Sequence, residues 1–567
     1  MRSIILRVKE FIFKIFKLYR EFFSNFYFRE KLILFICSVL IIVSLFSLVL
    51  KSYKFFTHEV PIEGGSYIEG IVGQPRNINP LYAPSNMVDR SLSYLIYSGL
   101  TKIDEKGNII PDIAERWEVK DNGKVFNFKL KHNVKWHDGE QLLSNDIRYT
   151  ISVIQDPDYT GPLKNEWKDV EVEVPDEYTV VFNLSKPQPS FIYNTTLGIL
   201  PEHIWAEFEV KDLPYVEQNL KPIGSNRFKF KETKTTENDF VKIIILEKNR
   251  DFYDKKPYID SVVFKFYDNS EKVFDALAKR EIMGTANLNQ DTYKKVKDWN
   301  KYKIFSYILP SYKAVFMNYP KNKLLESIDF RKALELSINK NDLINNKLLG
   351  VAICNNGIFI HNDAKNHFDI NAAKELLQKI GLKDTNNDGF LEKDNKEVEF
   401  KISILDDNES KIVGEFIKES FAKIGIHLNI EKKNLLELER DVIRPRNYEL
   451  LFFGQNLGFD LDLFSFWHSS QQKDPGLNFT SFSSKKTDII LENALKIEDR
   501  EKKKEVSKKV EEYIQEEHPA IFLYSPVFNF VLDKKVKGFN KQFLVYPEQR
   551  FLSVDKWYIK TQRVLNK

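Results

Sequence analysis

Apolar and polar positions alternate in several stretches of this chain, with the period that a half-buried β-strand requires. Phe126, Phe128 and Leu130 alternate with polar or charged neighbours. The same alternation occurs at residues 179–184 and 259–267. The sequence therefore predicts strands in these regions, spread along the chain rather than confined to one part of it.

Other stretches repeat apolar residues at the spacing of an α-helix. Residues 372–380 and 412–424 have this pattern, and residues 496–517 combine it with a high density of charge. Ser144 is a favourable N-cap, and Asp146 adds negative charge to the first turn of the helix that we expect to follow. Because predicted strands and helices are mixed along the whole length, the fold class is α/β or mixed α+β.

Residues 32–50 form an apolar run that contains no charged side chain. As an α-helix, this run nearly spans a hydrocarbon core of roughly 30 Å. The preceding residues 1–31 contain eight Lys or Arg and three Glu, a bias that keeps this end cytoplasmic and sends the rest across the membrane. Residues 1–31 have two open interpretations, an amphipathic helix on the cytoplasmic membrane face or a plain positive flank.

A cleaved signal peptide is the alternative to an anchor, but no small-residue A-x-A site follows the apolar run. Cys37 could suggest lipidation, yet Phe35 and Ile36 before it are not the small residues that a lipidation motif needs. We therefore expect an uncleaved transmembrane helix, a short stalk at residues 51–60, and a large extracytoplasmic part in the periplasm or outside the cell.

The part of the chain after the apolar run exceeds 500 residues, which is more than one hydrophobic core supports, so we expect at least two domains. Residues 1–31 carry a net charge of +5 in a chain of +4, which leaves the remainder close to −1, with Lys and Glu mixed throughout. This distribution argues against nucleic acid as a partner. Cys37 and Cys354 are the only cysteines, and we expect no disulfide between them.

A series of short motifs, in order over nearly the whole chain, resembles family 5 of the bacterial extracellular solute-binding proteins. These are the peptide, oligopeptide and nickel receptors of ABC importers. The motifs are N-P-L at 79–81, A-E-R-W-E-V, D-N-G-K, F-K-L-K and V-K-W-H-D-G-E within 114–140, P-I-G-S and F-K-F within 222–230, E-K-N-R-D-F-Y at 247–253, F-R-K-A-L at 330–334, F-D-I-N-A-A-K-E-L-L-Q-K-I-G at 368–381, and the apolar segment 519–538. Residues 225–227 depart from the family pattern, which continues with T-G-P-Y.

The resemblance implies a two-lobed fold like that of class II periplasmic binding proteins, with an additional inserted domain. Lobe one is then expected at residues 61–309 and 519–567, with the inserted subdomain at about 101–205. Lobe two is expected at 312–518, and the first crossing between lobes lies near residues 309–311.

The same resemblance implies a receptor that binds peptides or a similar solute in the cleft between lobes, by hinge closure, and delivers it to the permease and ATPase subunits of an ABC transporter. The apolar run at residues 32–50 adds the expectation that this receptor is anchored in the membrane. It implies transport without catalysis. A peptide-sensing or signalling module on the same fold is the alternative, because fold does not fix function. An extracellular hydrolase is a third possibility.

The family's pocket suggests which residues bind the ligand. From lobe one these are Tyr82, Ala83, Pro84 and Ser85; from lobe two Phe453, Gly454, Gln455, Asn456 and Leu457; and further candidates are Trp467, Phe528, Asn529 and Phe530. Peptide-binding members hold an extended ligand by main-chain hydrogen bonds, and an Asp neutralises its ammonium group. If Asp460 corresponds to the Asp of the family's D-P pair, that ammonium lies near Leu457, which cannot pair with a cation. Asp460 or Asp462 takes the role if the register differs. For each aromatic candidate, core packing is the competing interpretation.

No recognisable catalytic set is present: the sequence contains no G-x-S-x-G, no phosphate-binding glycine loop and no C-x-x-C. His132 and His137 are interpreted as surface residues rather than metal ligands. His468 lies between Trp467 and Ser469, but no acid at a recognisable spacing orients it, so we expect no enzyme.

The loop D-T-N-N-D-G that starts at Asp384 places oxygen-bearing side chains at alternate positions, with a Gly where an EF-hand loop bends. Phe390 can offer its carbonyl and Glu392 can bind through water, but the twelfth position is Asn395 rather than a bidentate Glu. Because the motif is incomplete, the sequence favours a turn that needs Asp and Asn for its backbone conformation over a calcium site. The expectation is therefore no cofactor and no metal, with calcium at this loop left open.

Overall fold

The structure is a computed structural model that describes residues 13–14, 17, 27–236, 240–286, 288–348, 351–360, 367–461, 463–497 and 499–566. The chain divides into two compact units. The first comprises residues 1–62 together with 560–567, and the second comprises residues 63–559. Most of the predicted cytoplasmic segment 1–31, and Asp462, lie outside the described residues.

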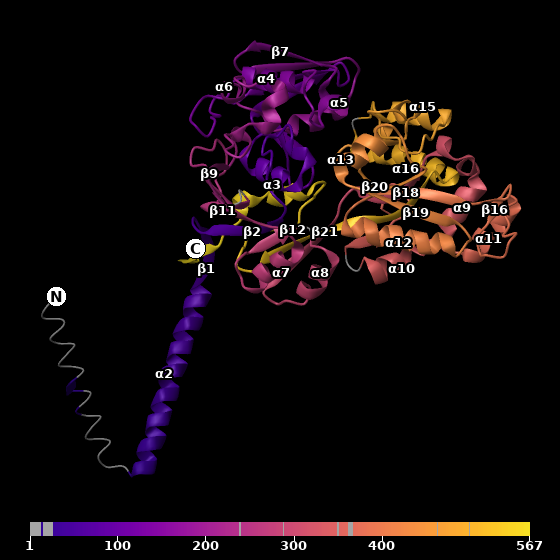
Figure 1. Ribbon diagram of the computed structural model, residues 1–567. Coiled ribbons are helices and arrows are strands. Elements are labelled where there is room, and N and C mark those ends of the chain that lie inside the picture. Colours follow the sequence, from indigo (N-terminus) through magenta and orange to yellow (C-terminus); the bar gives the residue numbers. More distant parts are fainter. Residues whose placement is uncertain are drawn as a thin grey trace. The chain divides into compact units, whose positions relative to one another are not determined.

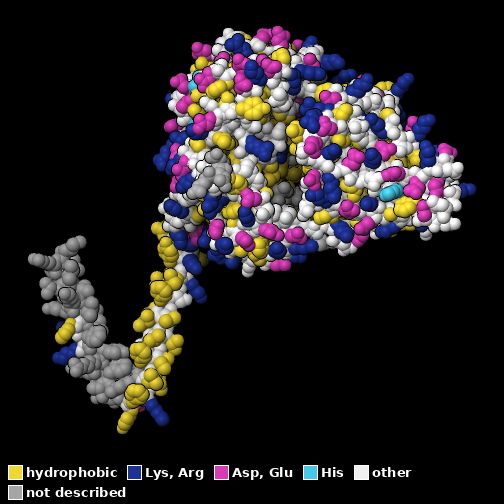
Figure 2. All heavy atoms as spheres, in the orientation of Figure 1, with side chains coloured by type: hydrophobic (Ala, Val, Ile, Leu, Met, Phe, Trp, Pro, Cys, Tyr) yellow, Lys and Arg dark blue, Asp and Glu magenta, His cyan; other side chains and the backbone are white. Residues whose placement is uncertain are grey.

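The first unit consists of one long helix, α2 (Phe28–Phe56), and a two-stranded sheet. In that sheet β1 (Thr57–Ile62) is antiparallel to β22 (Lys560–Leu565). The Nδ2 of Asn566 donates to the carbonyl of Phe55 at 2.7 Å and thereby satisfies one free carbonyl at the end of α2. Within the described residues, α2 is the one helix that is long and apolar enough to cross a membrane, and Figure 2 shows hydrophobic side chains along it. The predicted stalk at 51–60 is therefore the last turns of α2 and most of β1.

The second unit is built around a twelve-stranded sheet (Figure 1). Its main path runs β19-β18-β20-β14-β21-β12-β2-β11-β10-β9, and β13 and β15 both pair with β21. The strands are β2 (Ser66–Val72), β9 (Phe228–Thr235), β10 (Val241–Lys248), β11 (Ser261–Tyr267), β12 (Gly284–Ala286), β13 (Tyr302–Ile308), β14 (Ser311–Met317), β15 (Ala352–Cys354), β18 (Glu399–Leu405), β19 (His427–Lys433), β20 (Leu450–Asn456) and β21 (Ala520–Asp533).

The hydrophobic cores divide the second unit into two lobes. One pair of core clusters takes its residues from 67–309 and 528–557 and defines lobe one. The other pair takes its residues from 312–524 and defines lobe two. The chain therefore crosses between lobes at Leu309–Tyr312 and again inside β21, whose first half pairs with β14 and whose second half pairs with β13. The second crossing lies several residues later than the expected start of the returning segment at residue 519.

A separate four-stranded antiparallel sheet, in the order β5-β6-β8-β7, lies within lobe one. Its strands are β5 (Ala114–Lys120), β6 (Val125–Leu130), β7 (Val170–Asp176) and β8 (Thr179–Leu184), and β3 (Thr101–Ile103) and β4 (Ile109–Pro111) form a small hairpin before it. The alternation in the sequence is confirmed here, because Phe126, Phe128 and Leu130 are all buried. The helices of this lobe are α3 (Met87–Ile96), α4 (Ser144–Gln155), α5 (Lys164–Trp167), α6 (Glu202–Trp205), α7 (Ser270–Ala278) and α8 (Gln290–Val296).

The start of α4 differs from the sequence prediction by one residue. Leu143, not Ser144, is the N-cap, and the carboxylate of Asp146 accepts the backbone N–H of Leu143 at 2.8 Å. The hydroxyl of Ser144 instead donates to the carbonyl of Asp176 at 2.7 Å. From local sequence, the Ser144 hydroxyl was expected to cap the helix. It does not, because it donates to the carbonyl of Asp176 on β7 instead.

Lobe two packs helices on its half of the sheet, as Figure 1 shows. They are α9 (Ile328–Leu336), α10 (Lys340–Asp342), α11 (Ile370–Lys379), α12 (Asn408–Ala422), α13 (Leu435–Glu437), α14 (Phe464–Trp467), α15 (Lys485–Ala494) and α16 (Arg500–Glu517), and the hairpin β16 (Glu392–Lys393) with β17 (Lys396–Glu397) follows α11. The helices predicted at 372–380, 412–424 and 496–517 are confirmed as α11, α12 and α16. In α16 the charged surface has one apolar stripe, in which Val510 and Ile514 are fully buried.

Candidate ligand-binding cleft

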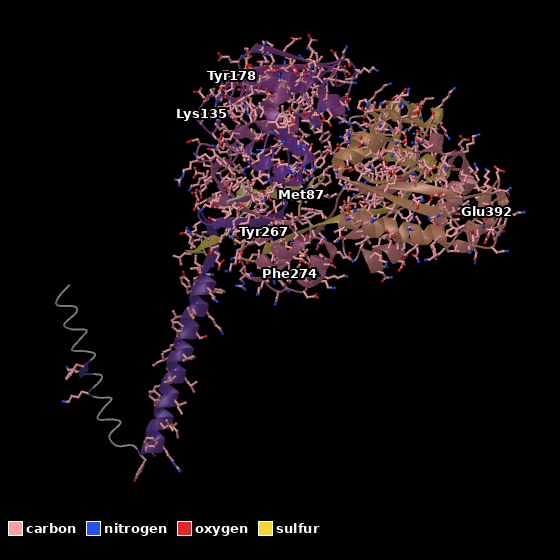
Figure 3. All side chains as sticks on the ribbon, in the orientation of Figure 1. Met87, Lys135, Tyr178, Tyr267, Phe274 and Glu392 are labelled. Carbon is pink, nitrogen blue, oxygen red and sulfur yellow. The ribbon has the colours of Figure 1, made fainter. Side chains whose placement is uncertain are left out.

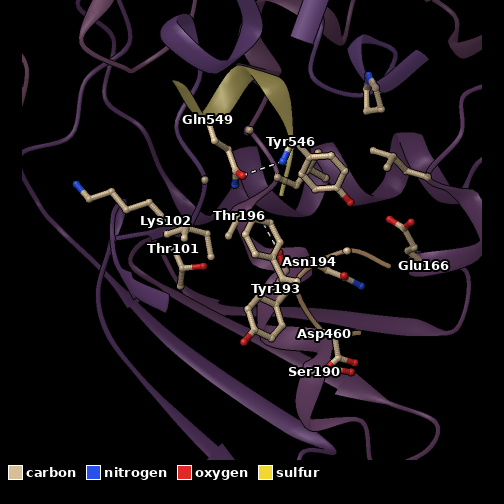
Figure 4. A pocket seen from close by; sticks show the side chains of 18 of the residues that line it. Thr101, Lys102, Glu166, Ser190, Tyr193, Asn194, Thr196, Asp460, Tyr546 and Gln549 are labelled. Carbon is tan, nitrogen blue, oxygen red and sulfur yellow. Dashed lines mark hydrogen bonds between the residues drawn. The ribbon is translucent and has the colours of Figure 1, made fainter. Parts of the chain in front are cut away.

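A cleft of about 1590 Å³ lies in the second unit and takes its walls from both lobes. Figure 2 shows the surface hollowed in this region, and Figure 4 shows part of the lining from close by. Aromatic side chains are frequent in the walls: Tyr94, Tyr97, Tyr193, Phe459, Phe464, Phe466 and Tyr546. Charged residues of both signs line it in nearly equal number, so the cleft as a whole favours neither a strongly cationic nor a strongly anionic solute.

The loop before α3 supplies part of the lobe-one wall. The side-chain carbonyl of Asn79 accepts the N–H of Leu81 at 2.9 Å, and its backbone carbonyl accepts the N–H of Ala83 at 2.8 Å. These bonds turn the chain tightly after the N-P-L motif and bring Ala83 and Pro84 to the cleft. Asn86 then caps α3 by accepting the N–H of Val88, which fixes where the loop ends.

The loop after β20 supplies the facing wall from lobe two. The N–H of Leu457 donates to the carbonyl of Pro310 at 2.8 Å, and the side chain of Asn456 accepts the N–H of Gly458 at 2.8 Å. Gly458 has φ 65°, in the left-handed region, so the chain turns sharply at this point. The next residue, Phe459, is thereby carried into the cleft.

This loop also contacts lobe one directly. The rings of Phe459 and Tyr193 are parallel, with an interplanar angle of 1° and centroids 5.6 Å apart. Phe459 also meets Tyr546 edge to face, at 5.8 Å between centroids. The side-chain amide of Asn456 donates to the carbonyl of Val545 at 3.2 Å. These contacts, which we name the interlobe latch (Asn456, Phe459, Tyr193, Val545 and Tyr546), hold the two walls together across one part of the cleft.

The acidic residues of the cleft differ in their surroundings. Asp460 is paired with Lys503, whose side chain is only 3% exposed. Asp112 pairs with Lys102 at 3.1 Å. Glu166, on α5, is exposed within the cleft and has no ion pair in the described part of the chain. Desolvation by the surrounding cleft atoms raises the pKa of its carboxyl to about 7. Figure 4 labels Glu166, Asp460, Tyr193 and Tyr546 among the residues that line the cleft.

Four of the residues predicted to bind ligand line the cleft. They are Ala83, Pro84, Asn456 and Leu457. The other nine, which do not line it, are Tyr82, Ser85, Phe453, Gly454, Gln455, Trp467, Phe528, Asn529 and Phe530. A direct role in binding stays a prediction for all thirteen, but the structure brings only the first four together at the cleft.

Four of the nine have structural roles that account for their residue types. Trp467 is 1% exposed and packs in the core of lobe two, and Phe528 and Phe530 belong to the core of lobe one. Gln455 is buried, where the Tyr312 hydroxyl donates to its side-chain oxygen and its own amide donates to the carbonyl of Leu477 at 2.9 Å. Gln455 and its neighbour Asn456 differ because successive side chains of a strand point to opposite faces of the sheet, and of the two only Asn456 lines the cleft.

Sequence reasoning missed several residues that shape the cleft, above all Tyr193, Phe459, Glu166 and Tyr546. Phe459 was adjacent to the predicted segment and could have been included with it. The other three lie in segments that carry no recognised motif and reach the cleft only through tertiary packing.

The two histidines His132 and His137, which the sequence analysis singled out, have different surroundings. The ring of His132 lies 3.9 Å from that of Tyr178, whereas the Nδ1 of His137 accepts the N–H of Gly224 at 3.2 Å. Burial lowers the pKa of His137 to about 4, so it is neutral near pH 7.

His468 has an acidic neighbour that its sequence spacing did not reveal. Its Nε2 lies 3.5 Å from Glu492 and 3.8 Å from Asp488, both on α15. The Nδ1 of His468 accepts the backbone N–H of Ser470 at 3.1 Å, which is the bond of a helix cap. The arrangement is explained by capping of the short 3₁₀ helix that follows.

Three comparisons with known proteins agree on the family. Residues 108–486 match the model of the bacterial extracellular solute-binding proteins, family 5. The chain is 29% identical to the oligopeptide-binding protein AppA of Bacillus subtilis over 553 residues, which cover 94% of this chain and 99% of that protein.

Solved structures give the same result. The structure of Bacillus subtilis AppA in complex with a nonapeptide matches with a TM-score of 0.73 and 28% identity, and the match covers 90% of this chain and 100% of that one. The structure of NikZ from Campylobacter jejuni in complex with Ni(L-His) matches with a TM-score of 0.71 and 25% identity, over 87% of this chain and 99% of that one. The fold is therefore the expected two-lobed, mixed α/β fold of periplasmic binding proteins, and the chain belongs to family 5 of the bacterial extracellular solute-binding proteins.

Proposed function

We propose that this protein is the receptor of an ABC importer and that it captures an extended peptide in the cleft between its lobes. The observation that carries the proposal is the cleft itself. Its volume of about 1590 Å³ exceeds the upper end, about 1,000 Å³, of ordinary small-molecule pockets. A site of this size suits an oligomeric solute better than a single small metabolite.

The chemistry of the walls also suits a peptide. Tyrosine and phenylalanine rings offer apolar surface for side chains, while the balanced charges allow a zwitterionic ligand. The described residues that line the cleft include no imidazole or thiol, so they offer none of the side chains that a bare nickel ion prefers. The nonapeptide complex of the related AppA supports the same choice.

Binding would proceed by closure of the two lobes. A ligand that contacts both walls stabilises the closed state by its differential affinity for that state. The interlobe latch consists of contacts that exist only when the walls meet, so ligand and latch favour the same state. The permease would then recognise the closed form.

Glu166 is our candidate for the group that forms an ion pair with the N-terminal ammonium or a cationic side chain of the peptide. It is an acid in the cleft wall with a raised pKa and no ion pair among the described residues, whereas Asp460 is already neutralised by Lys503. A ligand ammonium beside Glu166 would favour its ionised form.

Native mass spectrometry of the full chain, purified in detergent from its own host, tests the binding function. We expect co-purified peptides that are displaced by an excess of a synthetic peptide of the same sequence. Recovery of a non-peptide solute as the sole bound species would contradict the proposal. If the protein binds peptides but cells that lack it import them normally, the sensing alternative holds instead.

We also propose that α2 anchors the protein in the cell membrane as a single uncleaved span. Its length and apolar surface support this, as does the positive charge of residues 1–31. Intact mass and N-terminal analysis of the protein from washed membranes test the anchor. We expect a chain that retains α2 and resists extraction by alkaline carbonate, whereas a released chain that begins after residue 50 would show a cleaved signal sequence.

A further inference from the structure

The loop between α11 and β16 gathers three carboxylates at one point. An oxygen of Asp384, one of Asp388 and one of Glu392 all lie within 4.8 Å of one another. Within the described residues, none of the three forms an ion pair with Lys, Arg or His. Three negative charges so close together repel one another unless a cation or protons neutralise them.

Glu392 distinguishes this cluster from a group of exposed surface acids, because its carboxylate is buried. The residue is 8% exposed, and its Oε1 is buried without a hydrogen-bond partner. Its Oε2 accepts the backbone N–H of Thr385 at 2.7 Å and the hydroxyl of Thr385 at 3.0 Å, which holds the carboxylate against the loop. The Oδ1 of Asp384 is likewise buried without a partner. An unpartnered buried carboxylate oxygen is costly, and a bound cation would satisfy it.

The backbone holds these groups in place. The N–H of Glu392 donates to the carbonyl of Lys383 at 2.8 Å, and the N–H of Leu391 donates to the carbonyl of Gly425 at 2.7 Å. Asn387 and Gly389 have φ values of 61° and 95°, in the left-handed region, so the backbone of the loop turns sharply at these residues. The short strand β16 then begins at Glu392 itself.

We propose that this loop is a calcium site, with the carboxylates of Asp384, Asp388 and Glu392, the side-chain oxygen of Asn386 and the carbonyl of Phe390 as candidate ligands. All of these are the hard oxygen donors that Ca²⁺ prefers, and their spacing follows positions 1, 3, 5, 7 and 9 of an EF-hand loop. The sequence favoured a plain turn because the twelfth position is Asn395. The buried carboxylate of Glu392 favours the calcium site over the plain turn, because it can bind the ion directly at position nine of the loop.

The site would act on the structure of lobe two rather than on cargo. None of the three acids lines the cleft, and Figure 3 labels Glu392 in the region where Figure 1 labels β16, away from lobe one. Calcium would fix the connection between α11 and β16 against the chain at Gly425. The inference does not depend on the proposed peptide binding.

Calorimetric titration of the full chain in detergent, after removal of divalent ions with a chelator, tests this site with CaCl₂ as the probe. We expect one site with a dissociation constant on the order of 10⁻⁵–10⁻³ M, and weaker binding of MgCl₂ because the loop is open on its solvent side. Asp388→Asn and Glu392→Gln should each weaken calcium binding by about tenfold or more, because each removes a charged ligand. Asp388 is exposed, so D388N keeps the test valid if E392Q fails to fold.

Asp394→Asn is the matched control. Asp394 lies two residues beyond Glu392 in the turn of the same hairpin, has φ 53° and belongs to no ligand set, and Asn tolerates this conformation. D394N should bind calcium within twofold of the wild type. Absence of calcium binding by the wild type at about 10 mM CaCl₂, roughly ten times the weakest expected dissociation constant, would overturn the proposal. Equal losses in D394N and D388N, or equal affinity for magnesium and calcium, would overturn it as well.

Discussion

Two acidic residues, Glu69 in the interior of lobe one and Glu166 in the wall of the cleft, have opposite surroundings. In the interior, Glu69 is fully buried and receives two bonds from Arg550, at 3.0 and 2.5 Å, and one from the hydroxyl of Tyr67 at 2.7 Å. In the cleft wall, Glu166 has no ion pair within the described residues, and its pKa is raised to about 7.

The comparison distinguishes a carboxylate that stabilises the fold from one that is available to a ligand. A buried acid with a full set of partners stabilises the fold as long as every partner is present, and losing one leaves an uncompensated charge. An acid left without a partner next to a cavity costs stability unless a ligand completes it. The predictions below test whether this distinction holds, beginning with the interior.

Replacement of Arg550 by Met should have the largest effect. It leaves the charge of Glu69 buried without its cation, which should lower the free energy of unfolding by roughly 3–5 kcal/mol. Urea unfolding monitored by circular dichroism measures this. The double variant R550M with Glu69→Gln should recover part of the loss, because no charge then remains. A loss below about 1 kcal/mol in R550M would show that Glu69 does not need its partner.

Lobe two offers a pH-dependent test of the same idea. Burial alone would raise the pKa of Glu335, but the charge of Lys340 at 3.1 Å and the hydrogen bond to His518 at 2.7 Å outweigh it and hold the pKa at about 2. Because the folded pKa lies below the ordinary value of 4.5, the stabilisation is present above pH 4.5 and is lost as the pH falls toward 2.

The size of that loss follows from the shift. About 2.5 pKa units correspond to about 3 kcal/mol of stability, which the protein should lose between pH 4.5 and 2 through this group. Unfolding midpoints measured over this range for the wild type and for Glu335→Gln check it. The variant should be less stable at pH 7 but should show a flatter decline, and parallel curves would contradict the assignment.

Much of the fold could be predicted from local sequence, because the spacing of apolar residues indicates which segments are strands or helices, and the order of the motifs indicates the family fold. The alternation at Phe126, Phe128 and Leu130 does give a buried strand, and the helical patterns give α11, α12 and α16. The start of α4 could not be fixed, since Ser144 is recruited by Asp176, a residue far along the chain. Local rules fail where a tertiary partner competes for the same group.

The candidate site was less predictable for the same reason. The loops after Asn79 and β20 carry motifs, and each brings two predicted residues to the cleft. Tyr193 and Glu166 have no motif, and only packing of the inserted sheet places them at the wall. Trp467 shows the opposite case. It was predicted to bind ligand, but its side chain is buried in the core of lobe two.

Glu166→Gln should weaken binding of a peptide with a cationic group at the cleft wall by about tenfold, since a charge-assisted bond becomes a neutral one. Ionisation of Glu166 rises through pH 7, so wild-type affinity should increase from pH 6 to 8, and E166Q should show no such increase. Calorimetry at these pH values measures both. Glu207→Gln, an exposed acid outside the cleft, is the control and should behave like the wild type. A pH response retained in E166Q would assign it to another group.

Phe459→Ala should have the smallest effect of this set, because it removes a contact rather than a charge. Its parallel stack with Tyr193 and edge contact with Tyr546 are worth about 0.5–1.5 kcal/mol each beyond area burial. These contacts exist only with the walls together, so their loss should raise the peptide dissociation rate by about threefold to tenfold and leave the association rate nearly unchanged. Stopped-flow measurement with a labelled peptide separates the two rates. Phe453→Ala, in β20 before the loop that carries Phe459 and outside the cleft lining, controls for general damage to lobe two. If F459A slowed association instead, the latch would be a feature of the open receptor, and the distinction between cleft wall and interior would need a different physical basis.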